Sequence, residues 1–186
     1  MTPVLKTERL LLRPWDISDA ADLYRYAKDD RVGPPAGWPP HGSIAESEEI
    51  IRTIFMQEGV YALALDDGRA IGCVGVVRGE RSNLPISEME GEISYWIGVP
   101  FWGKGLVTEA VCELIRHAFK DLGLDALWCG YFDGNIRSER VQRKCGFIHH
   151  HTNPMQYIPM TGDSRIEHIS RLTRSRWEAM ASSPGL

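Results

Sequence analysis

The sequence predicts a mixed α/β domain with antiparallel hairpins and one βα crossover, and three observations support this fold class. Residues 91–122 combine a β-like run, a glycine-rich turn and a strongly periodic helix. The apolar runs 60–65 and 70–77 are joined by Asp66-Asp67-Gly68, a hairpin signal. Because 186 residues can bury one sizeable core, we expect residues 1–186 to form a single domain.

The first third of the chain is expected to hold one strand and two helices around a long loop. A strand over 8–15 precedes a short amphipathic helix over 20–27, for which residues 16–19 offer capping oxygens. Residues 31–43 contain four prolines and three glycines, so we predict a loop there. Helical spacing resumes over 43–58.

The second half of the chain is organised by a central strand over 93–99 and a long helix over 106–122, which Gly123 is expected to end. The remaining expected elements are a strand over 126–132, a short helix over 136–144, a strand beginning at 147–151, a loop over 153–163, a strand over 166–172 and a terminal helical turn over 174–180.

Composition and charge exclude several classes of protein. The net charge of −4 supplies no strong basic field, so nucleic acid is not an expected partner. Residues 1–13 hold no apolar signal core, and no run approaches the roughly 20 apolar residues of a membrane span, which favours a cytoplasmic location without a membrane partner. The four cysteines form no C-x-x-C pair and adjoin apolar runs, so buried free thiols are expected.

The turn between the central strand and the long helix is a candidate anion site. The first turn of a helix carries N–H groups without partners and the positive end of the dipole. Gly103 and Gly105 would let the backbone approach a phosphate without interference from a Cβ atom. The alternative is an ordinary βα turn in which glycine only relieves strain.

Two common phosphate motifs do not fit this turn. Residues 98–104 match the first seven positions of a P-loop, but Gly105 stands where Ser or Thr would hold magnesium, and Pro100 lacks an N–H group. The dinucleotide pattern G-x-G-x-x-G fails at its third glycine, which is Thr108.

A third pattern fits better, and it is carried by a set of short motifs. They are Thr7–Arg13, Tyr95-Trp96-Ile97, Pro100–Gly105, Thr108-Glu109-Ala110, Asn135 with Ser138, and Lys144–Phe147. With these motifs the segment 92–147 resembles the GNAT superfamily of N-acetyltransferases, in particular the group that acetylates ribosomal-protein N-termini (RimJ/RimL-like). Pro100 departs from the wider superfamily, where Gln or Arg is frequent, but proline is common in this narrower group.

The resemblance implies a GNAT-like fold, with a central mostly antiparallel sheet and helices on both faces, and acetyl-CoA as co-substrate. The turn and the helix start would bind the pyrophosphate, while the central strand would pair with the pantetheine arm. The residues implied for acetyl-CoA are Ile97, Val99, Trp102, Gly103, Lys104, Gly105, Leu106, Val107, Thr108, Asn135 and Ser138.

Two residues are candidates for catalysis, since acetyl transfer needs a neutral amine and a stabilised leaving thiolate. Glu92 is the candidate general base, acting directly or through water; alternatively it belongs to a solvated edge with Glu88 and Glu90. Many GNAT enzymes place a tyrosine on the helix after the Asn, but Gln142 occupies that position here and cannot act as an acid. Ser138 is therefore the candidate proton donor. Tyr131 and Tyr157 are more distant alternatives.

The acceptor site is the least constrained by pattern. Trp38 is expected either to line the acceptor pocket or to pin its loop to the surface. His149 and His151 could share one face of a strand and line the acceptor cleft. Three successive histidines cannot face one ion without distortion, so no metal is expected.

The expected function is transfer of an acetyl group from acetyl-CoA to a primary amine, by direct attack in a ternary complex. The acceptor would be a protein N-terminal α-amine or a small-molecule amine. The alternative is a non-catalytic acyl-CoA-binding or sensing module on the same fold. The resemblance also implies a monomer or a homodimer.

Overall fold

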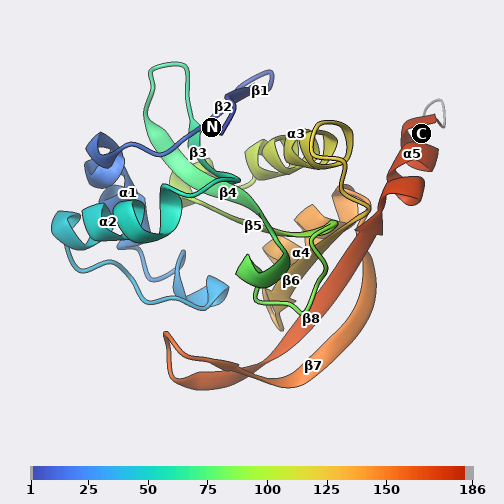
Figure 1. Ribbon diagram of the computed structural model, residues 1–186. Helices are drawn as coiled ribbons and strands as arrows, with labels where there is room; N and C mark the ends of the chain where they lie inside the picture. The colour runs from blue at the N-terminus through green and yellow to red at the C-terminus, as the bar shows by residue number, and fades with distance from the viewer. Residues whose placement is uncertain (1, 183–186) are drawn as a thin grey trace.

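The computed structural model, which describes residues 2–182, contains one eight-stranded sheet in the order β1-β2-β3-β4-β5-β6-β8-β7 (Figure 1). All neighbouring strands are antiparallel except β5 and β6, which run parallel. The strands are β1 (Leu5–Lys6), β2 (Leu11–Arg13), β3 (Val60–Ala64), β4 (Ala70–Arg78), β5 (Glu90–Ile97), β6 (Ala126–Phe132), β7 (Ile148–Ile158) and β8 (Asp163–Thr173). The helices are α1 (Ala20–Ala27), α2 (Ile44–Ile50), α3 (Leu106–Lys120), α4 (Ile136–Lys144) and α5 (Arg174–Ser182). The predicted mixed sheet with one βα crossover is confirmed.

Helices cover both faces of the sheet, so the core has two parts (Figure 1). On one face, α3 buries Leu114 and Ala118 against Ile93 and Leu127 of the central strands. On the other face, the smaller cluster lies under α1 and α2 and includes Leu23. Because apolar residues recur every three to four positions in α3, its buried stripe faces the sheet along its whole length.

The parallel strands β5 and β6 stay together only briefly. They pair at Glu90, Gly91 and Glu92, and the last pair is Glu92 with Trp128. Beyond it β5 continues to Ile97 and β6 continues to Phe132, without further pairing between them. The sheet therefore opens into a gap at its centre, and this gap positions the site.

Two predicted elements need correction. The expected strand over 8–15 is shorter, since only β2 (Leu11–Arg13) lies in this range; β1 (Leu5–Lys6) precedes a turn in which Thr7 N–H donates to Leu10 C=O (2.9 Å). The expected loop over 153–163 is wrong, since β7 runs on to Ile158 and pairs with β8. Pro154 lies at a register shift in this edge strand, where a missing N–H group is tolerated.

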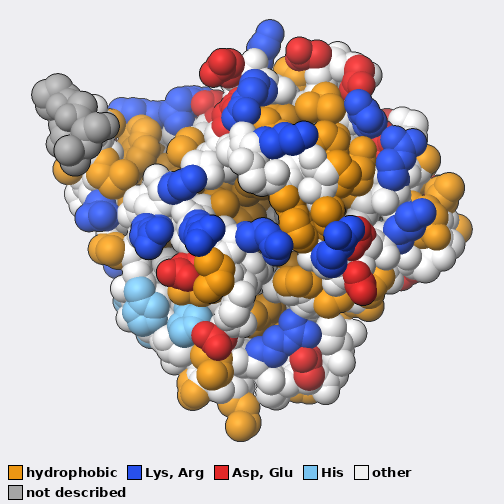
Figure 2. Space-filling view, turned by 180° about the vertical axis from the view of Figure 1, so that it is seen from behind, with side chains coloured by type: hydrophobic (Ala, Val, Ile, Leu, Met, Phe, Trp, Pro, Cys, Tyr) orange, Lys and Arg blue, Asp and Glu red, His pale blue; other side chains and the backbone are white. Residues whose placement is uncertain are grey.

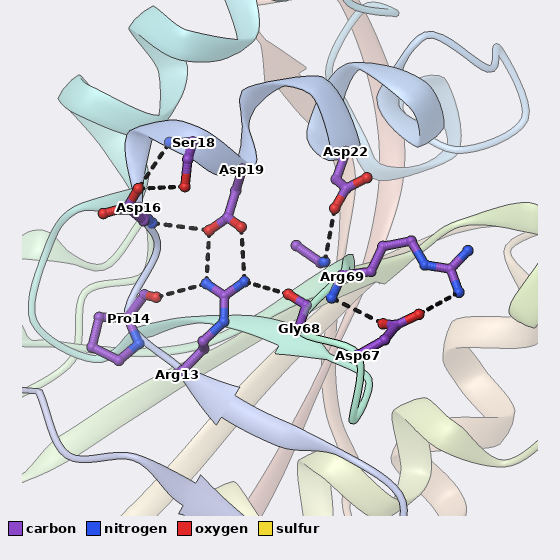
Figure 3. A network of polar contacts seen from close by, with 10 residues as sticks. Arg13, Pro14, Asp16, Ser18, Asp19, Asp22, Asp67, Gly68 and Arg69 are labelled. Carbon is purple, nitrogen blue, oxygen red and sulfur yellow. Dashed lines mark hydrogen bonds and ion pairs between the residues drawn. The ribbon is translucent and has the colours of Figure 1, made fainter.

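A half-buried ion pair between Arg13 and the buried Asp19 joins the end of β2 to the start of α1 (Figure 3). Arg13 donates from both terminal nitrogens to Asp19 (2.7 Å each) and also to the carbonyls of Pro14 and Gly68. The Asp19 carboxylate accepts a further hydrogen bond from Asp16 N–H (3.0 Å). These contacts give Arg13, the last residue of the N-terminal motif, a structural role.

Arg13→Met is expected to lower the free energy of unfolding by about 2–4 kcal/mol, because it leaves the buried Asp19 carboxylate without its cation. Arg69→Met is the matched control from the same network (Figure 3), since the side chains of Arg69 and Asp67 are 40% and 56% exposed. It should cost less than about 1 kcal/mol. Urea unfolding measures both, and equal losses would contradict the argument.

The prediction of four buried thiols holds for Cys73, Cys129 and Cys145 but is wrong for Cys112, which is exposed on α3. Its sulfur lies 3.8 Å from the sulfur of Cys145. Hydrogen bonding from Cys145 lowers the pKa of Cys112 to about 7. Burial instead raises the pKa of Cys73 to about 12 and raises that of Cys129 further.

Cys112 is therefore expected to react first with iodoacetamide at pH 7, about tenfold faster than a free thiol of ordinary pKa, because the thiolate is the nucleophile. Peptide mapping by mass spectrometry would identify the labelled residue. Cys112→Ser should abolish the fast phase, whereas Cys73→Ser should leave it intact. A fast phase that survives Cys112→Ser would contradict the assignment.

Candidate active site

The turn between β5 and α3 presents a row of unpaired backbone donors. Gly103 and Gly105 have φ angles of +74° and +76°, and Gly105 caps α3 without a side-chain hydrogen bond. Within residues 2–182, the N–H groups from Gly103 to Thr108 donate to no protein acceptor. Together with the helix dipole, they form a site suited to a phosphate group.

Two residues expected to contribute to this site are placed differently. Val99 lies beyond the strand in a 3-10 turn (Val99–Phe101), so the strand expected over 93–99 ends at Ile97, and a contact of Val99 with acetyl-CoA stays a prediction. Its carbonyl accepts from Trp102 N–H (3.1 Å), which removes that N–H group from the phosphate donors. The Trp102 indole N–H donates to the Ile97 carbonyl (3.0 Å) and braces the turn.

The backbone N–H group of Ile97 points toward the gap between β5 and β6. It pairs with Gly72, while Gly98 N–H donates to Ile71 C=O (2.9 Å). Ile97 therefore occupies a non-hydrogen-bonded position of the antiparallel pair, where backbone groups point away from β4. Its N–H group faces the space that opens between β5 and β6.

The N-terminal segment holds the phosphate turn in place through Glu109 of α3. This carboxylate accepts from Thr7 Oγ1 (2.6 Å), Arg9 N–H (2.8 Å) and Arg9 Nε (2.7 Å). Arg9 also donates to the Lys104 carbonyl (2.9 Å). Burial raises the pKa of Glu109, but these hydrogen bonds outweigh it and the net pKa is lowered. Glu109 thus links the N-terminal segment to α3 and fixes the position of the turn.

The surface around the turn is basic although the whole chain is acidic. Figure 2 shows Lys and Arg side chains in a band across one face, with hydrophobic side chains between them. The Arg137 guanidinium lies 3.8 Å from the centre of the Trp102 ring, and both Arg137 and Lys104 are exposed. This local positive charge suits an anionic ligand at the start of α3.

The start of α4 brings Asn135 and Ser138 to the gap. Asn135 caps the helix, since its Oδ1 accepts from Ser138 N–H (3.2 Å), and its Nδ2 donates to the Pro35 carbonyl (3.3 Å). Ser138 Oγ lies 2.9 Å from the Tyr95 hydroxyl. Burial raises the pKa of Tyr95 well above its usual value, so the phenol stays neutral. Gln142 is buried and donates to the Gly130 carbonyl (3.0 Å).

Tyr95 is a residue that the sequence motif contained but whose role was not predicted. Its contact with Ser138 joins β5 to α4, two elements that are far apart in the sequence. Only the tertiary structure reveals that the two hydroxyl groups are hydrogen-bonded to each other.

A pocket of about 250 Å³ lies on the face of the sheet opposite the one that α3 covers. Its lining residues are Asn83, Leu84, Pro85, Ile86, Trp128, His151, Asn153, Gln156 and Glu167. Glu92 adjoins it, because its carboxylate accepts from Ser82 Oγ (2.7 Å) and from Asn83 N–H (2.9 Å). Glu92 is therefore half-buried and held by the connection between β4 and β5. It does not belong to a solvated edge, which was the alternative to a role as general base.

The expectation that His149 and His151 share a face is wrong. The register shifts between them, so that His149 pairs with Ser170 and His151 pairs with Ile169. Because adjacent residues of β8 point to opposite faces, the bulge at His150 sends the two histidines to opposite sides. His151 lines the pocket, and His149 does not.

Trp38 packs edge-to-face against Trp96 of β5, with ring centres 5.8 Å apart. It thus pins the loop 31–43 to the sheet and is absent from the described lining of the pocket. Within residues 2–182, no three His, Cys, Asp or Glu side chains are grouped to hold a metal ion. None of the helices in that range is long and apolar enough to cross a membrane.

The fold and the site are those of an α/β domain with an anion site at a helix N-terminus and a gap between two diverging strands. The sequence profile of the acetyltransferase (GNAT) domain matches residues 9–148. The chain belongs to this family. It is an acetyl-CoA-dependent N-acetyltransferase by class, with acetyl-CoA as co-substrate.

Known proteins agree with this placement. "Putative ribosomal N-acetyltransferase YdaF" of Bacillus subtilis (strain 168) is 34% identical over 90 residues, which are 48% of this chain and 46% of that protein. The chain thus matches about half the length of YdaF. "Uncharacterized N-acetyltransferase p20" of Bacillus licheniformis is 30% identical over 129 residues, covering 66% of this chain and 70% of that protein.

A solved structure extends the likeness over nearly the whole fold. The microcin C7 self-immunity acetyltransferase MccE, in complex with acetyl-CoA and AMP, superposes with a TM-score of 0.73 at 19% identity. The match covers 89% of this chain and 93% of that chain. The resemblance to the GNAT superfamily is confirmed by the family match, and the name of YdaF favours the RimJ/RimL-like group within it.

Proposed function

We propose that this protein transfers the acetyl group of acetyl-CoA to a primary amine, by direct attack in a ternary complex. The observation that carries the proposal is the gap between β5 and β6. On one side it adjoins the phosphate turn 98–105, and on the other side it adjoins the pocket that holds Glu167 and is flanked by Glu92. The acceptor is a protein N-terminal α-amine or a small-molecule amine, and the word "ribosomal" in the name of YdaF favours a protein.

The cofactor would enter from the basic side. Its pyrophosphate would accept hydrogen bonds from the N–H groups of Gly103, Lys104, Gly105, Leu106, Val107 and Thr108. Its pantetheine arm would lie along β5, where Ile97 N–H faces the gap. Asn135, fixed as the cap of α4, would contact the arm near the thioester.

Catalysis would divide between the two faces. On the acceptor side, Glu92 would help to remove a proton from the amine, directly or through water. On the cofactor side, Ser138 would donate a hydrogen bond or a proton to the leaving thiolate, supplied in turn by Tyr95. A backbone N–H near Ile97 would polarise the carbonyl.

The acceptor would be shaped by His151 in the pocket and by the loop that Trp38 holds against Trp96. The single-domain organisation over residues 1–186, a cytoplasmic location and a monomeric or dimeric state stay predictions. For the domain, residues 1 and 183–186 lie outside the described part of the chain.

The test is release of free CoA from acetyl-CoA in the presence of peptides with different N-terminal residues, polyamines and amino compounds. At least one amine should accelerate release, and mass spectrometry should find the acetylated product. Calorimetry supplies the control, because acetyl-CoA binding must be observed before a negative panel counts. Binding without acceleration by any amine would contradict the proposal.

A further inference from the structure

Glu167 of β8 lies at the edge of the gap, on the face that carries Glu92. The register aligns Trp128 with Arg171 and Gly130 with Ile169, so Glu167 falls one row further toward the open end of the gap. A Cβ atom built at Gly130 would be 2.9 Å from Glu167 Oε1. The carboxylate therefore lies directly over the backbone of Gly130, just beyond the point where β5 and β6 separate.

This carboxylate has no cation of its own. Its Oε2 atom accepts one hydrogen bond, from Asn153 Nδ2 (3.3 Å). The arginines on the same face of β8 are engaged elsewhere, Arg165 with Asp163 and Arg171 with Glu90. Within the part of the chain that the structure describes, Glu167 forms no ion pair. A half-buried, uncompensated carboxylate in a pocket has an affinity for a cationic group.

We propose that Glu167 receives the acceptor amine and acts as the base in place of Glu92: it binds the ammonium group in the pocket and removes its proton before attack. This inference rests on the proposed function and assigns the acceptor a chemical class, a primary ammonium carried on a short apolar stem. The carboxylate recognises the charge, and Trp128 and the apolar run Leu84-Pro85-Ile86 supply the apolar part of the lining, beside the polar Asn83, His151, Asn153 and Gln156.

The charges around Glu167 support this role. Burial raises the pKa of Glu167, the hydrogen bond from Asn153 lowers it, Glu92 raises it further and His151 lowers it. The net pKa is raised. Of the other lining segments, residues 83–86 bring no charged side chain. A carboxylate of raised pKa is a stronger base than an exposed one.

The proton balance is complete. Glu167 takes one proton from R–NH₃⁺, and the resulting R–NH₂ attacks the thioester carbon. The C–N bond forms, the C–S bond breaks, and the second amine proton reaches the CoA thiolate through the Ser138 hydroxyl. Glu167 then releases its proton to water, so the products are the amide, CoASH and H⁺.

Glu167→Gln tests the inference with two readouts that move in opposite directions. The kcat/KM for the best amine should fall about a hundredfold, and its acid limb should disappear, while the Kd for acetyl-CoA is unchanged. The free energy of unfolding at pH 7 should rise. A carboxyl whose pKa is raised by folding destabilises the protein above its folded pKa and costs nothing below its unfolded pKa near 4.3. The stabilisation should therefore vanish below about pH 4.

The matched controls are Glu178→Gln, an exposed carboxylate on α5 that should change neither readout, and Glu92→Gln, which tests the competing base. If Glu167→Gln keeps kcat/KM within about threefold of wild type, or keeps the acid limb, this inference alone is overturned. If the wild-type protein neither binds nor acetylates any amine, both this inference and the proposed function are overturned.

Discussion

Gly105→Val is expected to raise the Kd for acetyl-CoA about a hundredfold while the protein stays folded. The φ angle of +76° at the start of α3 belongs to the left-handed region, which costs a β-branched residue roughly 1–2 kcal/mol. Relief of that strain would rotate the adjacent peptide groups away from the phosphate. Loss of one or two hydrogen bonds to a charged acceptor, at about 1.5–3 kcal/mol each, gives an effect of this size.

Gly68→Val is the matched control for strain. Gly68 has a φ angle of +85° in the β3–β4 turn, and a Cβ atom there would meet nothing within 4 Å. The two variants should lose similar stability in thermal unfolding, but only Gly105→Val should lose affinity in calorimetry with acetyl-CoA. An unchanged Kd for Gly105→Val would place the phosphates away from the start of α3.

The sequence was most informative where structure depends on neighbours along the chain. The predicted strand 126–132 and helix 136–144 have those bounds in the structure, because their periodicity and capping residues are local signals. The phosphate turn was also predictable, since glycine spacing and helix start lie within a few residues. The contacts between Arg9 and Glu109 that hold this turn were not predictable, because the two residues are separated by 100 residues in the sequence.

The misplaced features depend on pairing between distant strands. Pro154 suggested a loop, but an edge strand can carry proline at a bulge. The bulge at His150, which separates His149 from His151, leaves no mark in the sequence. Glu167 was missed because its position follows from the register of β8 on β6 and from the divergence of β6 from β5. The only sign of a site in the sequence was one acidic residue, Glu167, in a strand of alternating polar and apolar residues.

Ser138→Ala is expected to lower kcat about a hundredfold and to leave the Kd for acetyl-CoA within about threefold. The substitution removes the hydroxyl near the leaving thiolate but keeps the backbone N–H that Asn135 accepts as the helix cap. The geometry of α4 and the cofactor contacts should therefore persist. Steady-state kinetics and calorimetry separate the two effects, and an unchanged kcat would remove Ser138 from the mechanism.

Two further variants decide how the proton reaches the thiolate. Ser138→Thr keeps a hydroxyl at the same position and should recover much of the activity. Tyr95→Phe removes the phenol that lies 2.9 Å from Ser138 Oγ. If the two hydroxyls act as a relay, Tyr95→Phe and Ser138→Ala should have similar effects, and the double variant should be little worse than either. If Tyr95→Phe alone abolishes turnover while Ser138→Ala does not, the phenol is the donor.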